Sequence, residues 1–174
     1  MLLVGCTGSP GPRQSWVSSH GGFDAGGRQE RVDRAVRGLL DGVAAHAITV
    51  YVLDTAAVGA YGWPDGEVFL TRGLVDRLDD AEIAAAVAHE LGHLLRHGHA
   101  RNVVSLSGVD AAACEESAAD ALGVGLLIAH RVPADAMARM LATVAVSPGL
   151  SPACRRSLRQ RIDALLRQTP APSG

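Results

Sequence analysis

The chain has 174 residues and a formal net charge of -2, a size that suits one domain with a single core. Hydrophobic residues make up 48% but aromatic residues only 3%, so the core must consist mainly of Ala, Val, Leu and Ile. A basic excess is missing, which argues against a nucleic-acid-binding protein. The best candidate for a membrane span, Ala121–Ala129, is shorter than the roughly 20 residues needed and is better explained as a buried helix.

The N-terminal residues predict a leader and a flexible linker over residues 1–27. The four residues that end at Cys6 resemble a bacterial lipobox, in which the cysteine is lipidated after cleavage, and a Gly-, Ser- and Pro-rich stretch follows. This pattern predicts a lipid anchor at Cys6 and a periplasmic or lipid-anchored protein of the bacterial cell envelope. The apolar segment of roughly 7–15 residues that a signal peptide needs is almost missing. The alternative is therefore a chance match in a cytoplasmic protein.

The first half of the domain is predicted to contain one helix and two strands. Apolar residues recur at helical spacing over Gln29–Val43, which predicts an amphipathic helix. The β-branched stretch Ala47–Leu53 predicts a strand, and Asp54–Gly66, with three glycines and a proline, predicts a loop. A second short strand is predicted at Glu67–Thr71 and a helical turn at Leu74–Leu78.

The second half is predicted to be helical. Asp79 and Asp80 can cap a helix that runs over Ala81–His97. After a Ser- and Gly-containing connection, further helices are predicted at Ala111–Ala129, Pro133–Val146 and Cys154–Leu166. The expected fold class is α+β, mainly helical with a small β-sheet, in a domain over residues 28–168 with a tail at 169–174.

The segment His89-Glu90-Leu91-Gly92-His93 is an H-E-x-x-H sequence inside the Ala81–His97 helix. Residues four apart lie one above the other on a helix, so both imidazoles can reach one zinc ion. Glu90 lies beside them and can activate a water molecule as a general base. This helix is apolar all round, and buried polar groups cost free energy unless they are paired. The alternative is a hydrogen-bonded pair of core histidines.

Two residues compete for the third position on such a metal, because a catalytic zinc takes three protein ligands and keeps one position open. His99 has the spacing of the third ligand in metzincins, but Arg96 occupies the position where that motif needs glycine. Glu116 and Asp120 lie one turn apart on a later helix. One of these carboxylates can bind the metal while the other accepts a hydrogen bond from a ligand imidazole.

H-E-L-G-H followed by E-x-x-A-D at Glu116–Asp120 resembles the HtpX-like and CAAX-prenyl-protease-type zinc metallopeptidases, family forty-eight of the metallopeptidases. The resemblance runs from about Ile48 to the C-terminus, and the chain is most similar to the branch without membrane spans, which is soluble and periplasmic. It implies a zincin-type catalytic domain of the gluzincin kind with one Zn²⁺ per chain. By this resemblance His89, His93 and Glu116 bind zinc, Glu90 is the catalytic base, and Asp120 supports a ligand imidazole.

The resemblance also implies that a strand borders the cleft, where an exposed edge could pair with an extended substrate. The residues expected to form that edge are Glu67, Val68, Phe69 and Leu70. Arg161-Ile162 resembles an Arg-Ile pair of the family, but the His-Pro that precedes it in many members is absent. The favoured interpretation of Arg161 is a solvated helix face, with an active-site role as the alternative.

Cys114 and Cys154 remain as a pair if Cys6 is lipidated, and an oxidising compartment could bridge them. The alternative is two unrelated buried thiols. The predicted function is that of a zinc-dependent endopeptidase acting on unfolded or misfolded envelope proteins. Its partners are polypeptide substrates and not nucleic acids. The alternatives are a metzincin-type peptidase with His99 as ligand, and a non-catalytic, zinc-stabilised binding module.

Overall fold

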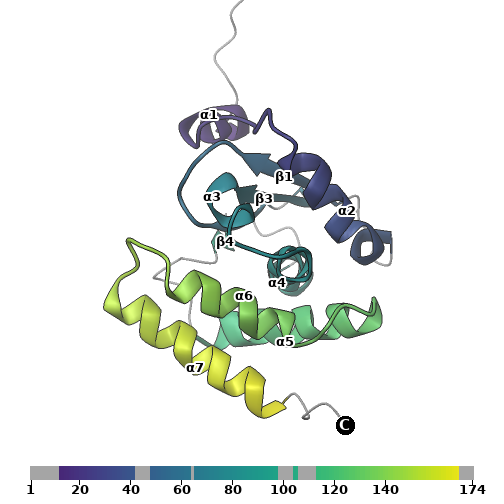
Figure 1. Cartoon of the computed structure of the whole chain (residues 1–174), viewed down its shortest axis with the longest axis vertical. Coiled ribbons are helices and arrows are strands. Elements are labelled where there is room, and N and C mark those ends of the chain that lie inside the picture. Colours follow the sequence, from purple (N-terminus) through teal and green to yellow (C-terminus); the bar gives the residue numbers. More distant parts are fainter. Residues whose placement is uncertain (1–11, 42–47, 64, 98–103, 106–112, 169–174) are drawn as a thin grey trace, which may run out of the picture.

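The computed structural model describes residues 12–41, 48–63, 65–97, 104–105 and 113–168 (Figure 1). The elements in chain order are α1 (Pro12–Ser19), α2 (Arg28–Asp41), β1 (Thr49–Leu53), β2 (Ala60–Trp63), β3 (Glu67–Thr71), α3 (Arg72–Val75), α4 (Asp80–His97), β4 (Val104–Ser105), α5 (Ala113–Ala129), α6 (Ala136–Ala145) and α7 (Pro152–Gln168). The predicted α+β class, mainly helical with a small sheet, is confirmed. Among the described helices, none has the length and apolar character needed to cross a membrane.

The four strands form one mixed sheet in the order β1-β3-β2-β4. β3 pairs with β1 in parallel and with β2 antiparallel, so its backbone is hydrogen-bonded on both sides. The prediction that Glu67–Leu70 forms an exposed edge is therefore wrong. The side chains of Val68, Phe69 and Leu70 are fully buried, because β3 lies between two neighbours and both of its faces are covered. The outer strands of the sheet are β1 and β4.

Helix α4 lies at the centre of the molecule. It packs against α2, β2, α5 and α6, and Figure 1 shows it between the sheet and the layer formed by α5, α6 and α7. This position explains why its sequence is apolar all round. The predicted cap is a reciprocal capping box: the Glu82 amide donates to Asp79 Oδ1 at 2.8 Å, and the Asp79 amide donates to Glu82 Oε2 at 2.9 Å.

The prediction of a flexible linker is wrong for residues 12–27, because α1 packs on the face of the sheet opposite α4 (Figure 1). Val17 is buried against the sheet, and the Arg13 guanidinium donates two hydrogen bonds to the Glu67 carboxylate. All six aromatic residues of the chain gather around this contact; they are Trp16, Phe23, Tyr51, Tyr61, Trp63 and Phe69. Residues 1–11 lie outside the described part.

The segment Asp54–Gly66 is not only a loop, because it contains β2 at Ala60–Trp63. Gly62 and Pro64 make this segment look like a loop in the sequence, because both residues are rare inside strands. The strand forms because it pairs with β3 on one side and β4 on the other. The short helix α3 begins two residues before the predicted turn at Leu74–Leu78. The predicted helices of the second half are confirmed, with ends that differ by at most three residues.

Candidate metal centre

The centre is built where α4 and α5 cross in backbone contact. A Cβ atom added to Gly92 would lie 2.5 Å from the carbonyl oxygen of Ala119, and one added to Gly123 would lie 3.1 Å from the carbonyl group of Ala88. Two glycines, one from each helix, therefore permit this crossing. Because the helices approach so closely, the first turn of α5 brings Glu116 to the histidines of α4.

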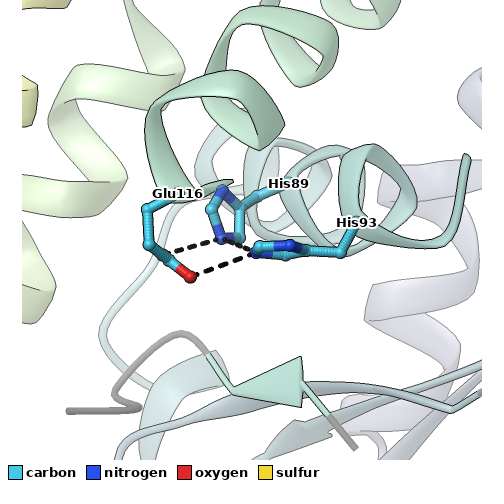
Figure 2. A group of neighbouring side chains, drawn as sticks. All are labelled: His89, His93 and Glu116. Atoms are coloured by element: carbon cyan, nitrogen blue, oxygen red, sulfur yellow. Dashed lines mark hydrogen bonds and ion pairs between the residues drawn. The ribbon is translucent and has the colours of Figure 1, made fainter. Parts of the chain in front are cut away.

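The side chains of His89, His93 and Glu116 converge, with one ligand atom from each within 4.8 Å of the others (Figure 2). The two Nε2 atoms are 3.2 Å apart, and Glu116 Oε1 lies 3.3 Å from Nε2 of His93. Ligand atoms around a tetrahedral zinc lie roughly 3.3 Å apart, because zinc–nitrogen bonds are about 2.0–2.1 Å long. Glu116 Oε1 is buried and accepts no hydrogen bond from the described residues. Two imidazoles and a free carboxylate oxygen fit a zinc ion.

Asp120 fixes the orientation of the His89 ring. His89 Nδ1 lies 2.9 Å from Asp120 Oδ1, which places the N–H of the imidazole on Nδ1. The lone pair of Nε2 is then directed at Glu116 and His93, as a metal ligand requires. Asp120 therefore contacts the His89 imidazole as expected, and its role in supporting a metal ligand stays a prediction.

Arg161 also belongs to this centre, and its interpretation as part of a solvated helix face is wrong. The residue is only 6% exposed. The guanidinium donates from Nε and Nη2 to the two oxygens of Asp120 and from Nη1 to Glu116 Oε2, each at 2.7 Å. The sequence does carry a signal for this burial: Arg161 follows Leu158 by three residues and precedes Leu165 by four, so it lies on the apolar face of α7.

Glu90 is fully buried, and neither of its carboxylate oxygens has a hydrogen-bond partner among the described residues. A Cβ atom on Gly62 of β2 would lie 3.2 Å from Glu90 Oε2, so the strand leaves just enough room for the carboxylate. Burial raises the pKa of Glu90, positive charge on His89 opposes it, and the resulting pKa is about 8. A carboxyl group that accepts no side-chain hydrogen bond from the described residues and has a pKa near neutral pH suits proton transfer.

The two groups facing each other across the centre have opposite pKa shifts. Burial lowers the pKa of His89, but hydrogen bonds to Asp120 and Glu116 and the charge of Glu90 outweigh it and raise the pKa to about 9. Burial raises the pKa of Glu116, but the imidazoles of His89 and His93, 3.5 and 3.3 Å from its oxygens, hold it far below its ordinary value. A metal ligand must be deprotonated, so a divalent cation would displace the proton of His89.

Three predicted residues are not placed by the structure. His99 and Cys6 lie outside the described residues, and so does the side chain of Cys114. Cys154, at the start of α7, is a half-buried free thiol. The proposed Cys114–Cys154 bridge stays a prediction.

Two histidines one turn apart, a glutamate beside the first of them and a second glutamate from a later helix form a candidate metallopeptidase site. Residues 27–115, which are 89 of the 174, match the family model of peptidase family M48. The chain belongs to this family of zinc metallopeptidases, and it is therefore a hydrolase that acts on polypeptides. A search of curated proteins finds no match. The matched region ends just before Glu116 and does not include Asp120 or Arg161.

Proposed function

We propose that the protein is a zinc-dependent endopeptidase in which His89, His93 and Glu116 hold the metal and Glu90 is the general base. The observation that carries this proposal is the convergence of three ligand atoms within 4.8 Å beside a buried carboxylate that accepts no hydrogen bond from the described residues. Burying a carboxylate that accepts no hydrogen bond costs free energy, so a purely structural role does not explain Glu90. A catalytic base, in contrast, needs a carboxylate that is available to accept a proton.

His89, His93 and Glu116 would hold the zinc ion, which would supply Lewis-acid chemistry by polarising the scissile carbonyl and making a water molecule more acidic. Glu90 accepts a proton from the attacking water and later delivers it to the leaving amine. Its raised pKa, about 8, suits both steps, because the group exchanges protons readily near neutral pH. Asp120 holds His89 in the tautomer that leaves Nε2 free for the metal.

An extended polypeptide is the substrate form that fits this site best, since the metal-binding side chains are buried and a folded protein could not reach them. Within the described residues, β4 is the outer strand beside β2 and also contacts α4. We assign the pairing of the substrate backbone to β4 in place of β3. Unfolded or misfolded envelope proteins are the proposed substrates.

Cell-envelope localisation is the part of the proposal that rests on sequence. It is supported by the lipobox-like residues before Cys6 and by the short distance from Cys6 to α1, which begins at Pro12. Lipidation would hold the domain within about 20 Å of the membrane surface, because five intervening residues reach no further. Metabolic palmitate labelling that is lost in Cys6→Ser would support this localisation, and an unlabelled chain would contradict it.

The two alternatives have less support. A metzincin site would need His99 as third ligand, whereas Glu116 already lies 3.3 Å from His93 Nε2. A non-catalytic module would not need Glu90, which is intact and beside the ligands.

The test is Glu90→Gln, which keeps the shape of the side chain and removes the base. Zinc content should stay at one per chain, while casein cleavage should fall by about 10²–10⁴-fold, as expected for a lost general base. Glu115→Gln is the matched control, because Glu115 precedes the ligand Glu116 and takes no part in the centre; it should retain both zinc and activity. Unchanged cleavage by Glu90→Gln would overturn the proposal.

A further inference from the structure

The two oxygens of Glu116 have different surroundings. Oε2 accepts a hydrogen bond from Arg161 Nη1 at 2.7 Å, whereas Oε1 accepts none from the described residues and lies 3.3 Å from Nε2 of His93. Oε2 is also 3.5 Å from Nε2 of His89. Arg161 thus holds one oxygen of this carboxylate, and the other faces His93 without accepting a hydrogen bond from the described residues.

We propose that Arg161 is a positioning residue that makes Glu116 a one-oxygen metal ligand, by holding Oε2 and leaving Oε1 for the zinc. This inference rests on the proposed metal site. A charge-assisted hydrogen bond at 2.7 Å competes with coordination for the same oxygen. If both oxygens bound the metal, the second would take the position that a catalytic zinc keeps open for water and substrate.

Arg161 acts on a second ligand through Asp120. Its Nε and Nη2 atoms bind both oxygens of Asp120, and Asp120 Oδ1 in turn lies 2.9 Å from His89 Nδ1. A planar guanidinium can make this fork and still reach Glu116, but a lysine ammonium cannot. Arg161 of α7 therefore orients His89 through Asp120 and also determines which oxygen of Glu116 is left for the metal.

The charges explain why an arginine is buried here. Glu90, Glu116 and Asp120 bring three negative charges into the centre when ionised, and these are all buried side chains. Arg161 contributes one positive charge and a divalent cation two, so the sum is zero. Unpaired buried charge is strongly destabilising. A divalent cation would neutralise two of the three carboxylates, and Arg161 neutralises the third.

Cobalt substitution tests this inference without relying on activity. Co²⁺ with four ligands absorbs visible light more strongly than Co²⁺ with five. The wild-type Co²⁺ protein should therefore show the intense spectrum, and Arg161→Gln and Arg161→Lys should both weaken it as Glu116 Oε2 joins the metal. Both variants should also bind zinc about 10–100-fold more weakly, the usual effect of losing a group that orients a ligand. Arg159→Gln, on the exposed side of α7, is the control and should change neither quantity.

The outcomes separate this inference from the proposed function. A wild-type chain that binds no metal at His89, His93 and Glu116 would end the proposed function. A chain that binds metal, with Co²⁺ spectra unchanged in the folded Arg161 variants, would overturn only the role of Arg161. If neither variant folds, a crystal structure of the wild-type zinc form decides: Glu116 bound through Oε1 alone supports the inference, and Oε2 within bonding distance of zinc overturns it.

Discussion

Gly92 of α4 and Ala119 of α5 lie in direct backbone contact. A Cβ atom at Gly92 would be 2.5 Å from the carbonyl oxygen and 2.9 Å from the Cα atom of Ala119, so no side chain fits between the helices. The glycine inside the H-E-x-x-H sequence thus has a packing role that the motif itself does not require. The distance from the two histidines to Glu116 depends on this contact.

Replacement of Gly92 by alanine should therefore separate α4 from α5. We expect Gly92→Ala to lose about 1–3 kcal/mol of unfolding free energy, as in other overpacked cores, and to bind zinc weakly. Gly125→Ala is the matched control on α5, because its Cβ would meet nothing within 4 Å. It should gain up to about 1 kcal/mol from helix propensity. Urea denaturation and metal analysis of both proteins check the prediction, and normal zinc content in Gly92→Ala would contradict it.

The identity of the third ligand can be read from metal content. Glu116→Ala removes the free oxygen beside His93 and should leave the purified protein with little or no zinc. His99→Ala should retain one zinc per chain. Zinc lost from the His99 variant alone would move the protein to the metzincin alternative.

The metal-free protein should become less stable as the pH rises from about 6.5 to 9. The folded-state pKa of His89 is about 9, against an ordinary value of 6.5, and that of Glu90 is about 8, against an ordinary value of 4.5. Both groups hold a proton more tightly in the folded state. Their contribution to stability is therefore complete below the unfolded pKa and is lost as the pH passes the folded pKa.

Zinc should reverse this trend, because its binding displaces the proton of His89 and so strengthens with pH over the same range. Urea denaturation at pH 6.5 and 9, with EDTA or with zinc, measures both effects. Asp120→Asn is the control: it removes the carboxylate that supports the proton on His89 and should flatten the pH dependence without metal. A metal-free wild type that is equally stable at both pH values would refute the assignment.

Helix α1 should contribute to the stability of the whole domain. Trp16 packs against Tyr61, Trp63 and Phe69 with ring centroids 5.2–5.4 Å apart. Trp16→Ala should destabilise the protein by about 2 kcal/mol, from lost apolar burial and ring contacts. Gln14→Ala, at an exposed position of the same helix, should have almost no effect. Equal melting temperatures for the two variants would show that α1 does not dock.

The sequence predicts those parts of the fold that depend on residues close together in the chain. The H-E-x-x-H helix, its Asp79 cap and the carboxylates one turn apart at Glu116 and Asp120 depend on spacing within one helix, and the structure has them as expected. The prediction of an exposed edge at β3 is wrong because strand order depends on pairing between distant segments, and the sequence of β2 does not indicate a strand. The burial of Arg161 was visible in its spacing from two leucines, but its partners lie 41 and 45 residues away.

The aromatic side chains around α1 also allow two parts of the molecule to be followed by different spectroscopic signals. Both tryptophans of the chain, Trp16 and Trp63, belong to this cluster, and residues 113–168, which form α5, α6 and α7, contain no aromatic residue. Intrinsic fluorescence therefore reports on the contact between α1 and the sheet, while circular dichroism is dominated by helices on the opposite side. Denaturation curves from the two signals would coincide if the halves unfold together and would separate if α1 and the sheet loosen first.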